Sequence, residues 1–285
     1  MTSILLCTDL DRTLIPNGTQ PEHPMARPLF RELCELPEIS LAYVTGRHLE
    51  LMQSAIKNFQ LPQPNYAITD VGTKIYHRDY QDWHPMRVWE NEIDQGWSEQ
   101  NLEQIQTSLR KISGLRLQEP SKQNTHKISF YADLQRQDSS DYLSQTKECL
   151  DRFGLTHSLI WSIDETIDLG LLDILPPNAT KLHAIEFLRD YLNFPYQATV
   201  FSGDSGNDLP VLISPIQSIL VANATDELKF QAYSEAQQNG NQLQFFQAEN
   251  THHSNGNYAA GILQGVEHYF PHIKERLHDW DKLYD

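Results

Sequence analysis

Both ends of this chain alternate short apolar runs with longer segments whose apolar residues recur at helical spacing. Runs this short, followed by turns, are typical of buried strands. The predicted strands are Ile4–Cys7, Leu41–Val44, Tyr66–Thr69, Leu171–Leu175, Ala198–Phe201 and Ile216–Val221. The predicted helices among them are Ala26–Leu36, His48–Phe59 and Ala179–Leu192. Strands that alternate with helices favour an α/β fold with a doubly wound, Rossmann-like parallel sheet, covered by helices on both faces.

The middle of the chain has a different pattern. Helical spacing covers Trp97–Ile112 and a segment near Asp141–Phe153, while strand-like runs cover His126–Ala132 and His157–Ile163. This mixture predicts an inserted α+β cap domain at residues 84–170. The core domain would then consist of residues 1–83 and 171–285.

The C-terminal tail is charged but carries an apolar stripe. Leu277, Trp280 and Leu283 recur at helical spacing within Lys274–Asp285. We therefore expect this tail to be helical, with its stripe placed to dock on the core.

Charge and cysteine content exclude several classes of protein. The formal net charge of −16 over 285 residues argues against binding to nucleic acid or to an anionic membrane surface, because both require a basic footprint. The three cysteines include no C-x-x-C motif, which favours reduced thiols in a reducing compartment. The apolar run near the N-terminus is interrupted by Asp9, unlike a signal peptide, and no apolar run is long enough to span a bilayer. These features predict a soluble, cytoplasmic protein.

Polar residues follow several of the predicted strands directly. Asp9 and Asp11 follow the first strand, Thr45-Gly46-Arg47 follows Leu41–Val44, and Gly203-Asp204-Ser205-Gly206-Asn207-Asp208 begins just after Ala198–Phe201. Lys181 comes at the start of the helix after Leu171–Leu175, and Asn178 is the predicted N-cap of that helix. Because ligands bind at the carboxyl ends of parallel strands, we expect these residues to converge on one site.

The residue types in this set indicate metal and phosphate chemistry. The four carboxylates of Asp9, Asp11, Asp204 and Asp208 would repel one another in an uncompensated acidic pocket, and a bound Mg²⁺ would relieve that repulsion. A phosphoryl group suits donors such as the Thr45 hydroxyl, the Gly46 amide and the Lys181 ammonium. Each motif alone is weak, since D-x-D also occurs by chance and in glycosyltransferases. The joint order, with each motif at a strand end, favours a functional site.

This set of motifs resembles that of the haloacid dehalogenase-like phosphatases, and the resemblance covers nearly the whole chain. It implies that Asp9 is the nucleophile and Asp11 the general acid/base. It also implies that Mg²⁺ is held by Asp9, by the backbone carbonyl of Asp11 and by Asp204, while Asn207 and Asp208 support the metal and the lysine. The inserted cap would match the subclass that acts on small phosphorylated metabolites.

Further strings are similar to the sucrose-phosphate phosphatase-like family. They are Asp70-Val71-Gly72-Thr73-Lys74-Ile75-Tyr76, His126-Lys127-Ile128-Ser129-Phe130, Leu172-Asp173-Ile174-Leu175-Pro176 and residues 255–263. The resemblance implies that Lys127 of the cap faces the sugar, and we assign Arg47 to substrate binding as well. Two departures from the family pattern are Arg12, where a small or amide residue is more usual, and the long stretch Asp164–Gly170.

The predicted function is Mg²⁺-dependent hydrolysis of a disaccharide phosphate, sucrose 6-phosphate above others, through an aspartyl-phosphate. Phosphates of mannosylfructose, glucosylglycerol and mannosylglycerate remain alternative substrates. A phosphomutase would share Asp9 and Asp11. The alternatives from another class are a non-catalytic sugar-phosphate sensor and a partner of a sucrose-phosphate synthase, although a pure binding module needs neither an aspartate pair nor the lysine.

Overall fold

The larger part of the fold is an eight-stranded sheet whose central strands are buried on both faces. In β1 (Ile4–Thr8) every residue is buried, with Leu5 and Cys7 in one apolar cluster and Ile4 and Leu6 in the other. The remaining strands, in spatial order around β1, are β12 (Phe245–Gln247), β11 (Gln217–Leu220) and β10 (Thr199–Gly203) on one side, and β2 (Ile39–Val44), β3 (Tyr66–Thr69), β4 (Lys74–Asp79) and β5 (Asp82–Pro85) on the other. The strands from β12 to β3 run parallel, and β4 and β5 extend the sheet as an antiparallel hairpin.

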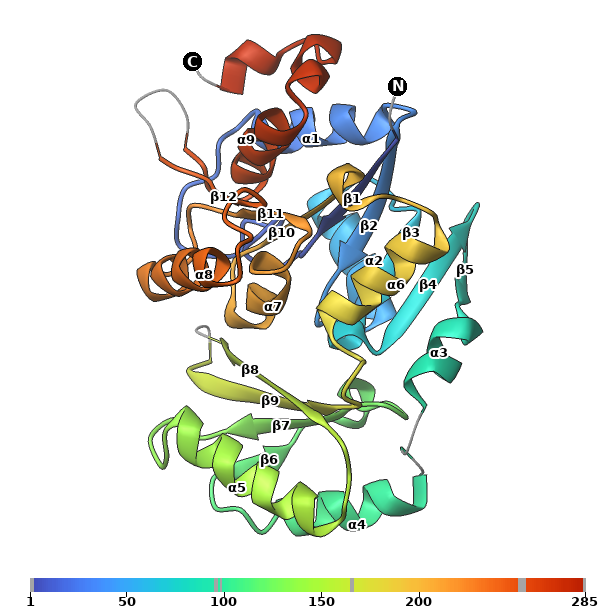
Figure 1. Cartoon of the computed structure of the whole chain (residues 1–285), viewed down its shortest axis with the longest axis vertical. Helices are drawn as coiled ribbons and strands as arrows, with labels where there is room; N and C mark the ends of the chain where they lie inside the picture. Colours follow the sequence, from blue (N-terminus) through green and yellow to red (C-terminus); the bar gives the residue numbers. More distant parts are fainter. Residues whose placement is uncertain (1–2, 95–96, 98, 165–166, 251–254, 284–285) are drawn as a thin grey trace.

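Helices cover both faces of this sheet, as the alternating pattern predicts (Figure 1). One face is covered by α1 (Ala26–Glu35), α2 (Leu49–Phe59) and α9 (Ala259–Tyr269). The other is covered by α3 (Arg87–Ile93), α6 (Lys181–Tyr191), α7 (Leu209–Leu212) and α8 (Asp226–Gln238). The doubly wound α/β fold is therefore confirmed.

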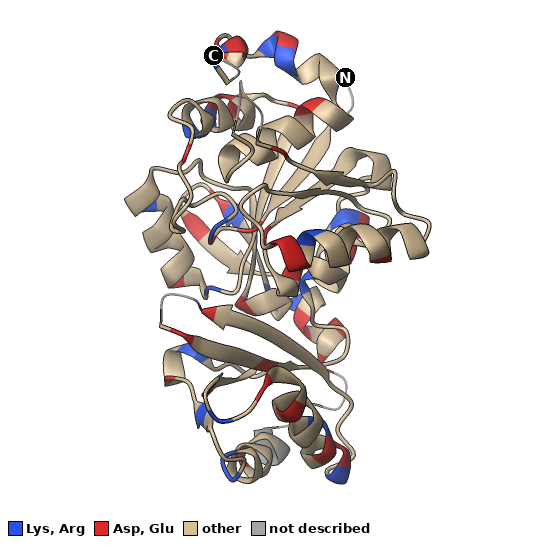
Figure 2. Cartoon of the chain, turned by 90° about the vertical axis from the view of Figure 1, so that its left-hand side faces the viewer, with Lys and Arg blue, Asp and Glu red and all other residues tan. Residues whose placement is uncertain are grey.

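The smaller part is a four-stranded antiparallel sheet with helices on one face. Its spatial order is β6 (Leu115–Leu117), β7 (Ile128–Ala132), β9 (Leu169–Leu175) and β8 (Ser158–Asp164). The helices α4 (Glu99–Leu109) and α5 (Ser139–Arg152) cover one face with a separate apolar cluster that includes Ile105, Tyr142 and Leu150. The opposite face turns toward the strand ends of the larger sheet, so that the two parts are stacked one above the other (Figure 2).

The structure differs from the predicted domain boundaries at both ends of the insertion. Residues 84–93 stay with the larger part, because β5 pairs with β4 and Trp89 is buried in the apolar cluster of the core. The run Leu171–Leu175, predicted as a core strand, belongs to β9 of the smaller sheet. Its side chains alternate: Leu172 and Ile174 are buried, while Asp173 lines a cleft. A short apolar run does not by itself reveal which sheet it joins.

The computed structural model describes residues 3–94, 97, 99–164, 167–250 and 255–283. The C-terminal segment docks on the core as predicted, although it forms two short 3₁₀ helices, Pro271–Arg276 and Trp280–Leu283, rather than an α-helix. Among the described helices, none is both long and apolar enough to cross a membrane.

Candidate active site

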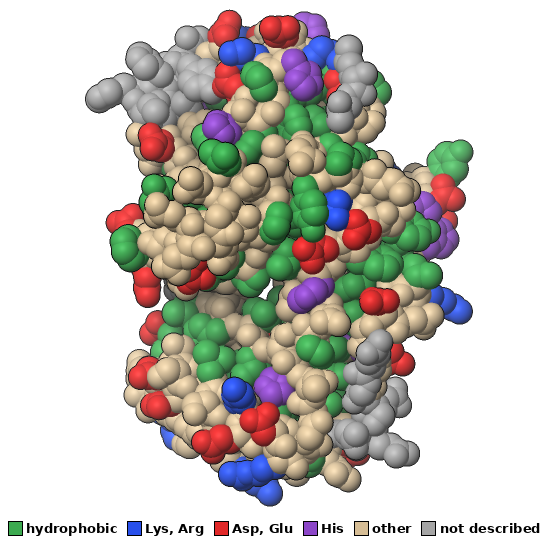
Figure 3. All heavy atoms as spheres, in the orientation of Figure 1, with side chains coloured by type: hydrophobic (Ala, Val, Ile, Leu, Met, Phe, Trp, Pro, Cys, Tyr) green, Lys and Arg blue, Asp and Glu red, His purple; other side chains and the backbone are tan. Residues whose placement is uncertain are grey.

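A cleft of about 720 Å³ lies between the carboxyl ends of the core strands and the polar face of the smaller sheet. Asp9 follows β1 and Asp204 follows β10, and these strands are neighbours in register, with Thr8 opposite Ser202. Arg47 enters from the loop after β2, which is the neighbour of β1 on its other side. The space-filling view shows the molecule hollowed at this level, between its upper and lower parts (Figure 3). The predicted convergence of strand ends is therefore what positions the site.

Lys181 lies at the centre of the site and is buried together with its two acidic partners, Asp9 and Asp208. Its Nζ donates to Asp9 Oδ1 at 2.8 Å, to Asp208 Oδ1 at 2.7 Å and to Asn207 Oδ1 at 3.0 Å. Burial raises the pKa of Asp9 to about 7, against the lowering effect of Lys181. Burial would lower the pKa of Lys181, but the carboxylates of Asp208 and Asp9 raise it on balance, so the lysine stays charged. The arrangement places a fixed cation beside the predicted nucleophile.

Lys181 is the first residue of α6 and lies in its first turn, as predicted, but two positions nearer the start of the helix than the sequence predicts. The N-cap is Thr180, whose hydroxyl accepts a hydrogen bond from the His183 amide, rather than the predicted Asn178. The ammonium group therefore extends from a helix N-terminus, where the dipole also favours an anion.

Three buried carboxylates are close enough to share a cation. Within the described residues, one oxygen from each of Asp9, Asp204 and Asp208 lies within 4.8 Å of the others. Asp208 already accepts several hydrogen bonds. Lys181 donates to its Oδ1, while the amides of Asp204 and Ser205 donate to its Oδ2. Hard oxygen donors of this kind fit a divalent cation such as Mg²⁺. The geometry therefore favours Asp9 and Asp204 as carboxylate ligands, with Asp208 holding Lys181 and the loop.

Asp11 lines the same cleft, but its carboxylate is not part of that cluster. Arg47 donates to it through Nε at 2.7 Å and through a terminal nitrogen at 2.5 Å, and Asn17 Nδ2 donates at 2.8 Å. The predicted role of Asp11 as a metal ligand would thus fall to its backbone rather than to its carboxylate. Arg47, predicted to bind substrate, lines the cleft while it holds Asp11.

Cations of the chain compensate the acidic pocket in part, because every acid of the set has a cation beside it. Lys181 forms ion pairs with Asp9 and Asp208, and Arg47 forms one with Asp11. Arg12 Nε lies 3.4 Å from Asp204 Oδ2. Sequence reasoning missed this balance although Arg12 and Arg47 stand inside the acidic and phosphate-binding motifs themselves.

The predicted phosphate-binding loop rests on a strained turn. Asp70, Val71 and Gly72 all have left-handed backbone angles, with φ of 52°, 63° and 111°. A β-branched residue such as Val71 is rarely found in that region. The Val71 amide donates to the Thr45 carbonyl at 3.1 Å, and a Cβ on Gly72 would lie 2.5 Å from the backbone of Thr180. The turn thereby joins Thr45 and Gly46 to the start of the lysine-bearing helix. Thr45 itself is buried, and Gly46 lines the cleft.

From the smaller sheet, several polar side chains face the same cleft. Lys127, just before β7, lines the cleft but pairs with Asp70 of the core at 3.0 Å, and both side chains are buried. Asp173 in β9 accepts a hydrogen bond from the Ser129 hydroxyl, and burial raises its pKa. Gln118 and Lys122 also line the cleft. No role was predicted for Asp70 or Asp173, although a carboxylate inside an otherwise apolar strand is a visible signal.

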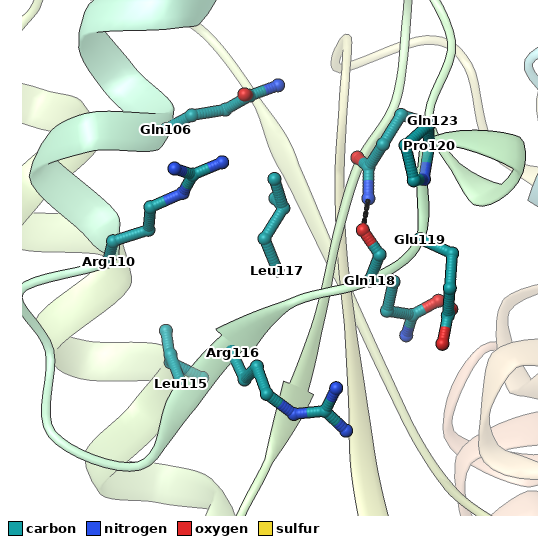
Figure 4. Close-up of a pocket in the computed structure, with 9 residues that line it drawn as sticks. All are labelled: Gln106, Arg110, Leu115, Arg116, Leu117, Gln118, Glu119, Pro120 and Gln123. Carbon is teal, nitrogen blue, oxygen red and sulfur yellow. Dashed lines mark hydrogen bonds between the residues drawn. The ribbon is translucent and has the colours of Figure 1, made fainter.

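A second hollow of about 820 Å³ lies at the β6 edge of the smaller sheet, between α4 and β6 (Figure 4). Its lining, which includes Arg110, Arg116, Gln118 and Gln123, contains none of the predicted site residues. Its single acidic lining residue is Glu119. The cleft is therefore the better candidate for a catalytic site, since it brings together acids, cations and backbone donors.

Comparisons with known proteins identify the relatives of this chain. A family model described as sucrose-6F-phosphate phosphohydrolase matches residues 2–270. A protein of Nitrosococcus oceani described as a HAD-like hydrolase is 46% identical over 271 residues, which cover 95% of this chain and 73% of that protein. The mannosylfructose-phosphate phosphatase of Agrobacterium fabrum is 26% identical over 266 residues, which cover 93% of this chain and 96% of that enzyme.

A solved structure is similar over almost the same extent. The sucrose-phosphatase of Synechocystis, in complex with sucrose and phosphate, superposes with a TM-score of 0.75 at 26% sequence identity. The match covers 94% of this chain and 98% of that one. Against the plant sucrose-phosphatases of Arabidopsis thaliana and Nicotiana tabacum that it matches, the chain spans 59% of their length.

Proposed function

The chain belongs to the sucrose-6F-phosphate phosphohydrolase family, and we propose that it hydrolyses the phosphate monoester of a disaccharide, with sucrose 6-phosphate as its substrate. The observation that carries the proposal is the contact of 2.8 Å between buried Asp9 and buried Lys181, in a cleft covered by a polar sheet. A nucleophilic carboxylate beside a fixed cation is suited to attack on a phosphoryl group.

The proposed reaction has two steps. Asp9 attacks phosphorus, the bond to the sugar oxygen breaks, and an aspartyl-phosphate forms. Asp11 donates the proton that the leaving sugar oxygen requires, and afterwards takes a proton from the water that hydrolyses the intermediate. Lys181, the Thr45 hydroxyl and the Gly46 amide bind the phosphoryl oxygens and offset their charge, while Asn207 and Asp208 hold Lys181 in place.

We propose Asp9 and Asp204, with the backbone carbonyl of Asp11, as the residues that hold Mg²⁺. When bound, the ion would neutralise charge that develops on the phosphoryl oxygens. Burial and the neighbouring Asp9 and Asp208 raise the pKa of Asp204 well above its ordinary value, so a cation would stabilise its ionised form.

We propose that the four-stranded part, from about Asp94 to Pro176, is a cap that selects the sugar. The phosphoryl site would contact the same group in every sugar phosphate. Discrimination between sugars must therefore come from side chains that contact the sugar hydroxyls. Gln118, Lys122, Lys127 and Asp173 line the cleft from that side. A site built to bond hydroxyls rejects molecules that lack them.

Mannosylfructose phosphate is the second candidate substrate, favoured by the similarity to the Agrobacterium fabrum enzyme over nearly its full length. The complete set of acids and the lysine disfavours a purely sensing role. An association with a sucrose-phosphate synthase, and a cytoplasmic location, are further parts of the proposal.

The test is phosphate release from a panel of purified substrates. The panel contains the 6-phosphate of sucrose, the phosphates of mannosylfructose, glucosylglycerol and mannosylglycerate, and p-nitrophenyl phosphate. We expect the highest kcat/KM for sucrose 6-phosphate. A higher value for another member would reassign the substrate. If the unaltered chain releases phosphate from every substrate no faster than an Asp9→Asn variant does, the sensing role is favoured instead.

A further inference from the structure

Arg12 has an unusual backbone conformation that is fixed from both sides. Its φ is 59°, in the left-handed region that residues other than glycine adopt uncommonly. Asn17 Oδ1 accepts a hydrogen bond from its amide at 2.8 Å, and Asn223 Nδ2 donates to its carbonyl. Because both the amide and the carbonyl of Arg12 are held, the fold fixes the point at the edge of the cleft from which this side chain extends.

The side chain of Arg12 lies against a carboxylate of the proposed metal site. Its Nε is 3.4 Å from Asp204 Oδ2, and the Thr13 hydroxyl donates to Asp204 Oδ1 at 3.1 Å. Both oxygens of Asp204 therefore have a neighbour from the same short segment of chain. The Asp204 side chain is only 4% exposed, whereas that of Arg12 is 22% exposed and lines the cleft. The guanidinium is therefore the partner of this pair that is more accessible from the cleft.

We propose that Arg12 is an internal counter-ion that competes with the divalent cation for Asp204 and thereby weakens the binding of the metal. The inference rests on the proposed function of the same site. A positive charge this close to a buried ligand repels an incoming cation, because the medium around buried groups screens charge poorly. The guanidinium also compensates Asp204 in the metal-free protein, so that metal binding exchanges one cation for another rather than filling a bare acidic pocket.

The experiment measures Mg²⁺ affinity by isothermal titration calorimetry of the full chain. Arg12→Asn removes the charge with a residue that tolerates the left-handed region, and Arg12→Lys keeps a charge. Arg27→Gln is the matched control, because Arg27 is also a partly buried arginine paired with a carboxylate, that of Glu22, away from the cleft lining. We expect Arg12→Asn to bind Mg²⁺ about tenfold more tightly than the unaltered chain. Arg12→Lys and Arg27→Gln should stay within about threefold of it.

Equal or weaker binding by Arg12→Asn would overturn the inference, and weaker binding would show that Arg12 instead holds Asp204 ready for the metal. Circular dichroism checks that each variant is folded, and Arg12→Gln provides the same test if the asparagine variant is not. If the unaltered chain binds no Mg²⁺ and hydrolyses p-nitrophenyl phosphate fully in EDTA, the metal in the proposed function is refuted, and the inference with it. If the unaltered chain binds Mg²⁺ and Arg12→Asn does not bind it more tightly, the inference fails while the proposed function stands.

Discussion

Lys127 of the cap and Asp70 of the core form an ion pair of 3.0 Å in which the two side chains are 4% and 7% exposed. The pair connects the two parts of the molecule at the edge of the cleft. Its core partner belongs to the strained turn that supports the proposed phosphate-binding loop. The position of the cap is thereby tied to the site where the phosphoryl group would bind.

Removal of Lys127 alone should therefore affect both stability and specificity. Lys127→Met leaves Asp70 as a buried charge without its partner, and we expect a loss of about 3–5 kcal/mol in the free energy of unfolding. The double variant Lys127→Met/Asp70→Asn should recover most of that loss. In the double variant, kcat/KM for sucrose 6-phosphate should still be about tenfold lower, while p-nitrophenyl phosphate, which carries no sugar, should react almost normally. Equal losses for both substrates would place Lys127 with the phosphate site.

Asp9→Asn should lower turnover by several orders of magnitude with the fold intact, because the amide keeps the shape of the side chain but lacks the nucleophilic oxygen. The measurement is single-turnover phosphate release, with circular dichroism to confirm folding. Asp226→Asn is a control, since that side chain is fully exposed at the start of α8. Turnover close to normal in Asp9→Asn would refute the assignment of the nucleophile.

Removal of the metal should abolish activity, and Mg²⁺ should restore it. Asp204→Ala should raise the Mg²⁺ concentration needed for half-maximal activity or eliminate activity. Mg²⁺ should also raise the Tm of the unaltered chain, because a ligand that binds only the folded state stabilises it. This shift should be lost in Asp204→Ala. Undiminished activity in chelator, with metal removal verified by elemental analysis, is the contrary result.

Asp173 should make the protein less stable as the pH rises. Burial raises its pKa in the folded state above the ordinary value of about 3.9, so the folded protein holds the proton more tightly than the unfolded chain. The free energy of unfolding should therefore fall with increasing pH between that value and the raised pKa. Asp173→Asn removes this loss, so its stability relative to the unaltered chain should be higher at pH 7.5 than at pH 4.5 in urea unfolding. A difference that does not change with pH would contradict the assignment.

Gly72→Ala should damage both folding and catalysis, because a Cβ at this position would lie 2.5 Å from the Thr180 carbonyl carbon and 2.8 Å from the Lys181 amide nitrogen. Gly240→Ala is the matched control, since Gly240 also has a positive φ but has no other heavy atom within 4 Å of the added Cβ. We expect a loss of about 1–3 kcal/mol for Gly240→Ala from backbone strain alone. The loss for Gly72→Ala should be larger and accompanied by a lower kcat. Equal losses, with kcat unchanged in both, would argue against this packing role.

The central strands could be predicted because burial on both faces leaves a continuous apolar run, as in β1. The ends of such strands meet at one edge, which is why Asp9 and Asp204 could be brought together from distant parts of the sequence. The sequence pattern assigns Lys181 to the same site for a reason that the structure does not support, because the strand before it belongs to the smaller sheet. By contrast, β6 contains only Leu115–Leu117 and is too short for a periodic signal. The run Leu171–Leu175 in β9 resembles a core strand, because an apolar run does not reveal with which strand it pairs.

Pairings that depend on how the two parts dock could not be predicted. The contact between Lys127 and Asp70 needs both the left-handed turn and the placement of the smaller sheet. The contact between Arg12 and Asp204 lies within the core, and it could not be predicted because the sequence pattern does not reveal the positive φ of Arg12.

The docked C-terminal segment has a practical consequence for protein production. The family model ends at residue 270, yet Ile273, Leu277, Trp280 and Leu283 beyond it are buried in the apolar cluster that includes residues of α1 and α9. In Figure 1 this segment lies at the end of the molecule opposite the cap. A chain shortened to the family boundary would expose the apolar surface that these residues cover, and exposed surface of this kind promotes aggregation. Expression of the shortened chain should therefore give inclusion bodies or soluble aggregates, even though every proposed catalytic group is retained.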